Sequence, residues 1–112
     1  MTEQLVRTVR EMLQVVAPAL EEILTAEELA ATSTRVIRQP AGESMLTIKD
    51  WPAVTSEDAL SDETLLEFRT FEDWGGSWMQ GRETAAEIYA RFRSELQDYV
   101  AESKFGWGQW RP

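Results

Sequence analysis

The stretch TLLEFRTFED, residues 64–73, decides the fold of this chain, because apolar side chains recur along it with the period of a strand. Leu66 and Phe68 fall on one face of the predicted strand, and Leu65 and Phe71 fall on the other. A strand with apolar residues on both faces is typical of a sheet that is also partly covered on its second side. The rest of the chain must therefore supply cover for this strand.

Two further strands are predicted before this one, near residues 34–39 and 44–50. Both segments are rich in β-branched and apolar residues, and a proline and a glycine lie between them. We expect these two segments to pair as a β-hairpin. After residues 64–73, the stretch WGGSWMQG, residues 74–81, is expected to be a loop because of its glycine content.

Helical periodicity marks the two ends of the chain. Apolar residues at spacings of three and four over residues 5–24 predict an amphipathic helix that Thr2 caps, with a kink or a break at Pro18. The sequences TAEE and TAAE have the spacing of capping boxes. They predict a short helix over residues 25–31 and a long C-terminal helix over residues 84–103.

The predicted order is α(α)βββα, which is a two-layer α+β fold. In it, a small antiparallel three-stranded sheet packs against amphipathic N- and C-terminal helices. The length predicts a single domain, residues 1–112. The aromatic C-terminal tail, residues 105–112, is expected to pack back on the core, with Phe105 and Trp107 buried and Trp110 more exposed.

The composition excludes several chemistries. The chain contains no histidine and no cysteine, which removes Ser-His-Asp and Cys-His nucleophiles, disulfides and thiolate metal sites. No catalytic motif, metal site or cofactor is predicted, so we expect a protein that is not an enzyme. No apolar run approaches the roughly 18 residues of a membrane span. We therefore expect a cytoplasmic protein without membrane contact.

The charge is strongly acidic and unevenly distributed. The net charge is −9, and residues 57–73 alone carry seven acids against one base, giving −6. A phosphate backbone requires a basic footprint, so direct contact with nucleic acid is disfavoured. A basic protein partner would be attracted instead.

The leading functional hypothesis is a non-enzymatic acidic protein-binding module of the immunity, inhibitor or chaperone type, which engages a basic protein. Acidic side chains would attract that partner and tryptophans would anchor it, since tryptophan is enriched at binding hot spots. The same tryptophans could instead serve only to pack glycine-rich loops over one end of the core. The candidate binding residues are Glu57, Asp58, Asp62, Glu63, Glu67, Glu72, Asp73, Trp74, Trp78 and Trp110.

Two further predictions remain open at this stage. The alternative function is a small enzyme or ligand-binding protein whose pocket combines the tryptophans with carboxylates such as Glu72, Asp73 and Glu83. A homodimer is also predicted, because Leu65 and Phe71 would leave apolar surface on the second face of a small sheet.

Overall fold

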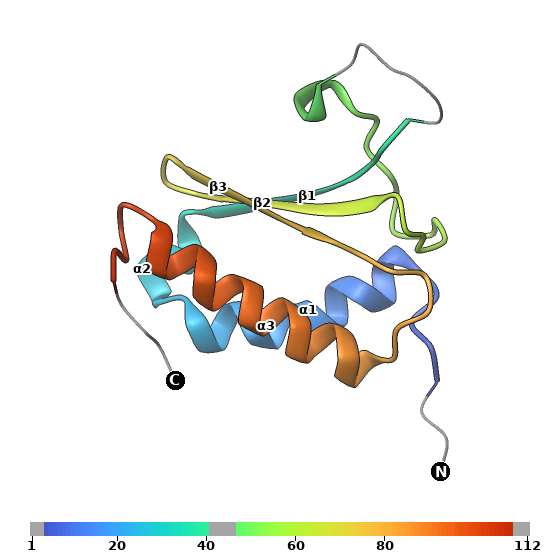
Figure 1. Cartoon of the computed structure of the whole chain (residues 1–112), viewed down its shortest axis with the longest axis horizontal. Helices are drawn as coiled ribbons and strands as arrows, with labels where there is room; N and C mark the ends of the chain where they lie inside the picture. Colours follow the sequence, from blue (N-terminus) through green and yellow to red (C-terminus); the bar gives the residue numbers. More distant parts are fainter. Residues whose placement is uncertain (1–3, 41–46, 109–112) are drawn as a thin grey trace.

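The computed structural model of the chain, which describes residues 4–40 and 47–108, has two layers (Figure 1). Three antiparallel strands in the order β1-β2-β3 form one layer, and the long helices α1 and α3 form the other. This confirms the predicted α+β fold class and the order of its elements. The elements are α1 (Val9–Ile23), α2 (Ala26–Ala30), β1 (Thr32–Arg38), the 3-10 helix η1 (Ile48–Asp50), β2 (Thr64–Thr70), β3 (Asp73–Trp78) and α3 (Ala85–Glu102).

Two of the three strands differ from the prediction. The segment expected to pair with β1 contains η1 instead of a strand over Ile48–Asp50, and residues 44–46 lie outside the described residues. The partner of β1 is β2, which also pairs with β3. The expected loop at residues 74–78 is wrong, because these residues belong to β3. The glycines that suggested a loop serve close packing within the sheet.

Gly75 lies on the inner face of β3, where the sheet meets α3. A Cβ atom at this position would come within 2.4 Å of Phe68 Cε2 and 2.7 Å of Tyr99 Cδ1. The Phe68 ring packs edge-to-face against Tyr99, with ring centroids 4.7 Å apart, and against Phe92, at 5.8 Å. Glycine is thus required here because two aromatic rings occupy the space of a side chain.

The Tyr99 hydroxyl joins α3 to the end of the β2–β3 hairpin. It accepts a hydrogen bond from the backbone N–H of Thr70 at 3.0 Å and donates one to the carbonyl of Asp73 at 2.9 Å. The hairpin then turns through Phe71 and Glu72, and Phe71 adopts a left-handed φ of 55°. Burial raises the pKa of Tyr99, which keeps the hydroxyl protonated in this role.

The first helix begins later than the sequence predicts. Thr8, not Thr2, is its N-cap, and the Thr8 and Glu11 side chains form the capping box. The residues before it run extended alongside distant parts of the chain, with the Val6 N–H bonded to the Glu83 carbonyl. The helix is continuous through Pro18, so the alternative of a break at that residue is wrong. Both other predicted capping boxes are present.

The main core lies between the inner face of the sheet and the two long helices. Leu66 and Phe68 of β2 are buried against it, together with apolar residues of both helices. The central members on the helices are Met12, Val16, Ile88, Phe92 and Leu96, each no more than 1% exposed. The periodicity of the sequence therefore located the inner faces of β2, α1 and α3 correctly.

Candidate functional site

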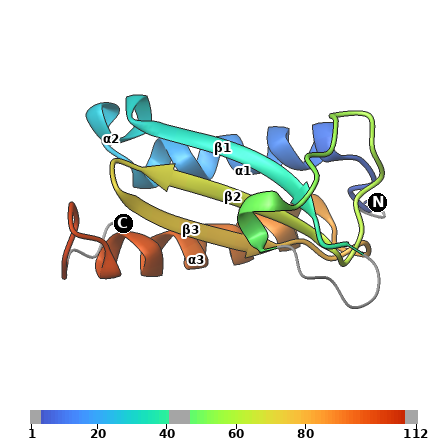
Figure 2. The ribbon, with the colours of Figure 1, turned by 90° about the horizontal axis from the view of Figure 1, so that it is seen from above.

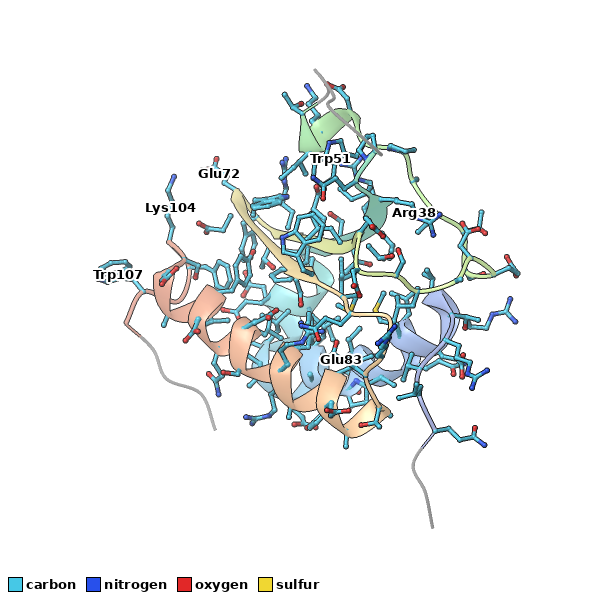
Figure 3. The ribbon with its side chains drawn as sticks, turned by 45° about the vertical axis from the view of Figure 1, so that its right-hand side comes forward. Arg38, Trp51, Glu72, Glu83, Lys104 and Trp107 are labelled. Atoms are coloured by element: carbon cyan, nitrogen blue, oxygen red, sulfur yellow. The ribbon has the colours of Figure 1, made fainter. Side chains whose placement is uncertain are left out.

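The outer face of the sheet, opposite the helices, carries most of the described tryptophans. Trp74 and Trp78 of β3 are both 44% exposed, and their alternation with Gly76 puts the two rings on the same side of the strand. Trp51, from the segment that follows η1 (Figure 3), packs against Trp78 with ring centroids 5.8 Å apart. We call the surface made by Trp51, Trp74, Gly76 and Trp78 the tryptophan face.

Gly76 allows the tryptophan face to be flat. A Cβ atom on Gly76 would lie 3.4 Å from Trp74 Cη2 and 3.2 Å from Leu65 Cδ1. The Trp74 ring therefore lies along the strand over the glycine. The two glycines of β3 thus make room on opposite faces. Gly75 leaves space for core rings on the inner face, and Gly76 leaves space for the Trp74 ring on the outer face.

The chain between β1 and β2 runs along the outer edge of β1 and brings the Trp51 ring to Trp78 on the outer face. Its Val54 N–H donates to the carbonyl of Val36, and its Pro52 carbonyl accepts from the Arg38 N–H. Beneath this segment and the tryptophans, Ile37 is fully buried and Leu65 is 2% exposed. The apolar surface that motivated a homodimer is therefore partly covered within one chain, because Leu65 is buried.

The charges on the tryptophan face itself are nearly balanced. The guanidinium of Arg35 contacts the Glu67 carboxylate at 3.2 Å and the carbonyls of Ile48 and Lys49 at 3.4 Å. Arg69 is exposed and lies opposite Trp74 in the register of the sheet. The acidic character predicted for the binding surface thus resides elsewhere.

The predicted acidic residues fall at the two ends of β2. Glu57, Asp58, Asp62 and Glu63 precede the strand, whereas Glu72 and Asp73 follow it. Seven residues of extended strand separate these groups, which corresponds to about 20 Å. The structure therefore does not join these carboxylates into one cluster, and the tryptophan face lies between the two groups.

Several of these carboxylates are held by neighbouring groups. The Glu57 carboxylate contacts the Arg10 guanidinium at 2.7 Å, and both side chains are exposed. Asp58 accepts from the Thr55 N–H at 2.6 Å, and Asp62 accepts from the Gly81 N–H at 2.9 Å. Such exposed contacts organise the loop and contribute little to the free energy of unfolding.

The second acidic group lies beside the C-terminal tail (Figure 3). Asp73 accepts from the Lys104 N–H at 3.1 Å, and the Glu72 carboxylate lies 3.9 Å from the Lys104 ammonium. Phe105 packs between Tyr99 and Phe71, with ring centroids 5.8 Å and 5.9 Å away. This part of the tail lies against the core.

Trp107, the tail tryptophan that the structure describes, does not join the tryptophan face. Trp107 is 76% exposed and points away from the molecule at the far end of α3 (Figure 3). The expectation that it is buried is wrong, because the Gly106 N–H bonds to the C-cap Ser103 and the Gly108 N–H bonds to Ala101 of α3, which leaves the ring outside. Trp110, a predicted anchor, lies outside the described residues.

A partly buried ion pair between Glu83 and Arg91 lies on the inner side of β3 and was not anticipated from the sequence. Glu83, only 8% exposed, binds Arg91 through both carboxylate oxygens, at 2.5 Å and 2.9 Å. Arg91 also donates to Ser77 of β3 at 3.0 Å and to Glu95 at 3.2 Å. The hydrogen bonds that Arg91 donates to Glu83 raise the pKa of Arg91; burial opposes this effect, and the charge of Glu83 adds to it. This network attaches α3 to β3.

The described residues offer little for metal or acid–base chemistry. Within residues 4–40 and 47–108, no group of three or more acidic side chains could hold a metal ion. Of the carboxylates proposed for a pocket, Glu72 is exposed, Asp73 caps the tail and Glu83 is bound to Arg91. None of the helices in the described part of the chain has the length and hydropathy to cross a bilayer.

Comparison of the chain with protein-family models, with curated proteins and with solved structures finds no match. Its function must therefore be argued from its own surface. Sequence reasoning identified Trp74 and Trp78 but missed Trp51 and Gly76. The alternation of Trp74, Gly76 and Trp78 with a period of two was the signal of a strand with one aromatic face.

Proposed function

We propose that this chain is a non-enzymatic protein-binding module that engages a basic protein through the tryptophan face. The observation that carries the proposal is the pair Trp74 and Trp78, each 44% exposed on the sheet face that the helices leave open. Exposed tryptophans on one surface bury large areas on association and dominate the energy of many interfaces. Trp51, whose ring packs against Trp78 at a tilt of 52°, extends the same surface.

Charge supports a basic partner over an acidic one. The net charge of −9 attracts cationic proteins over a distance limited by the Debye length, about 10 Å at moderate salt. The acidic groups before and after β2 lie on either side of the tryptophan face. In this proposal the acids accelerate and orient the encounter, and the tryptophans supply the contact that slows dissociation.

The alternative of a catalytic or ligand pocket receives less support. It requires two carboxylates that converge beside Trp74 and Trp78, whereas Glu67 on that face is paired with Arg35. The chain also contains no histidine or cysteine to act near neutral pH. Binding through an open aromatic surface needs neither group.

The test is capture of partners from a lysate of the source cells by three forms of the full chain. These are the natural sequence, a Trp74→Ala/Trp78→Ala form and a Trp107→Ala form. We expect the natural sequence to retain proteins of high isoelectric point at low ionic strength and to release them as salt rises. The double variant should lose them while its far-ultraviolet circular dichroism stays unchanged, because both rings are half exposed.

Trp107→Ala is the matched control, since this ring is more exposed than the other two but lies outside the tryptophan face. It should capture the same proteins as the natural sequence. Capture that survives the double variant, or that depends on Trp107 instead, would contradict the assignment of the surface. An acidic partner, or one retained equally at high salt, would contradict the role of charge.

A further inference from the structure

The outer edge of β3 differs from the outer edge of β1. In an antiparallel sheet, alternate residues of an edge strand direct their N–H and C=O groups away from the neighbouring strand. On β1 these residues include Val36 and Arg38, and both are bonded to the segment over residues 52–54. The chain thus covers part of the β1 edge with its own backbone.

On β3 the outward residues are Trp74, Gly76 and Trp78. The Met79 N–H bonds to the Thr64 carbonyl, so the odd-numbered residues of β3 face β2 and the even-numbered ones face away. Among the described residues, no backbone hydrogen bond engages these outward groups. The strand also lacks the proline, lysine or bulge with which proteins usually protect an edge.

The residues beside the β3 edge determine which side chains an added strand should carry. Seen from above, α3 runs beneath and alongside β3 (Figure 2). Arg91, whose side chain reaches Ser77 of β3, begins a stripe on α3 at helical spacings of four, three and four. The other members of the stripe are Glu95, Asp98 and Glu102, and together with Glu83 the group has four acids against one base, giving −3.

We propose that the β3 edge binds an extended segment of the basic partner as a fourth strand. The inference rests on the proposed function and adds the mode of binding. Side chains on one side of the added strand would lie beside Trp74 and Trp78 and should be apolar. Side chains on the other side would lie above the acidic stripe of α3 and should be lysine or arginine. The partner segment is therefore an amphipathic basic β-strand.

The probe is a displayed library of random peptides long enough to span the six residues of β3. We expect selection on the full chain to enrich peptides in which basic and apolar residues alternate. A selected peptide should slow hydrogen exchange at the amides of Trp74, Gly76 and Trp78, because these N–H groups become hydrogen-bonded. It should also shift tryptophan fluorescence.

Two controls separate strand addition from simple adhesion. N-methylation of the peptide amides that face β3 should weaken binding by about tenfold or more, whereas methylation of the alternate amides should not. An Asp98→Asn/Glu102→Gln form should bind the basic peptide several-fold more weakly and with less dependence on salt. A Glu21→Gln/Glu27→Gln form, with the same change of charge on α1 and α2, should bind as the natural sequence does.

The inference is overturned if no alternating basic peptide is selected, or if both methylated sets bind equally. It is also overturned if the outward amides of β3 become protected without peptide as protein concentration rises, since a second copy of the chain then occupies the edge. A third outcome separates the inference from the proposed function. If the Trp74→Ala/Trp78→Ala form loses partner capture, but the peptide does not protect the outward amides of the natural sequence, strand addition is overturned and the proposed function stands. The tryptophan face would then bind through side chains alone.

Discussion

The two faces of the sheet differ in how far their side chains are exposed to solvent. On the inner face, Leu66 and Phe68 are no more than 2% exposed, and two helices fill the space around them. On the outer face, Trp74 and Trp78 remain 44% exposed, and only a short segment covers one end. The difference indicates that the inner residues maintain the fold, whereas the outer aromatic residues lie at a surface open to solvent.

The largest expected effect comes from breaking the inner face. Phe68→Ala removes a ring that packs against Phe92 and Tyr99, and should lower the free energy of unfolding by about 3–5 kcal/mol. Trp74→Ala removes a larger ring from the outer face and should cost less than about 1 kcal/mol. Chemical denaturation of both variants measures the difference. Equal costs would show that Trp74 belongs to the stabilising core.

The adjacent glycines of β3 give a sharper comparison. Gly75→Ala forces a Cβ against Phe68 and Tyr99 on the inner face, and should destabilise by about 1–3 kcal/mol. Gly76→Ala meets the flexible end of Leu65 at 3.2 Å on the outer face. Its strain should be offset by the lower entropy of the unfolded chain, so that the net change stays within about 1 kcal/mol. Thermal unfolding of the two variants measures both changes. A larger loss of stability in Gly76→Ala than in Gly75→Ala would contradict the comparison.

The smallest expected effect concerns the hydrogen bonds between α1 and α3, the two helices that cover the inner face. Glu22 of α1 accepts from the Tyr89 hydroxyl and from Arg93 of α3, and these bonds, in that order, lower its pKa below the ordinary 4.5. A lowered pKa in the folded state gives stability that is present above the unfolded pKa. This stability is lost as the pH falls through the folded value.

Glu22→Gln should therefore lower the melting temperature slightly at neutral pH and reduce the further loss between about pH 5 and about pH 3. The effect is small because the carboxylate is exposed to solvent. Glu21→Gln is the control, since within the described residues the exposed side chain of this neighbour makes no hydrogen bond or ion pair. If both variants follow the same pH profile, the contact between the helices contributes nothing measurable.

Part of the candidate site could be anticipated from the sequence. Trp74 and Trp78 were predicted as anchors, and they lie together on an open surface. Trp51 joins them only because the segment after η1 crosses the outer face and brings its ring to Trp78. The acidic residues looked like one cluster because they are close in sequence. In the fold, the length of β2 separates Asp62 from Glu72.

The sequence by itself determined the fold class, the inner faces of α1, β2 and α3, and the helix starts at Thr25 and Thr84. Each of these depends on residues within a few positions of one another, through side-chain periodicity or a capping box. Only the tertiary structure decided that β2 pairs with both β1 and β3, and that Trp51 packs against Trp78. The glycines of β3 accommodate rings from β2 and α3, and residues before α1 pair with the start of α3. Contacts between residues so distant in the chain leave no local pattern to read.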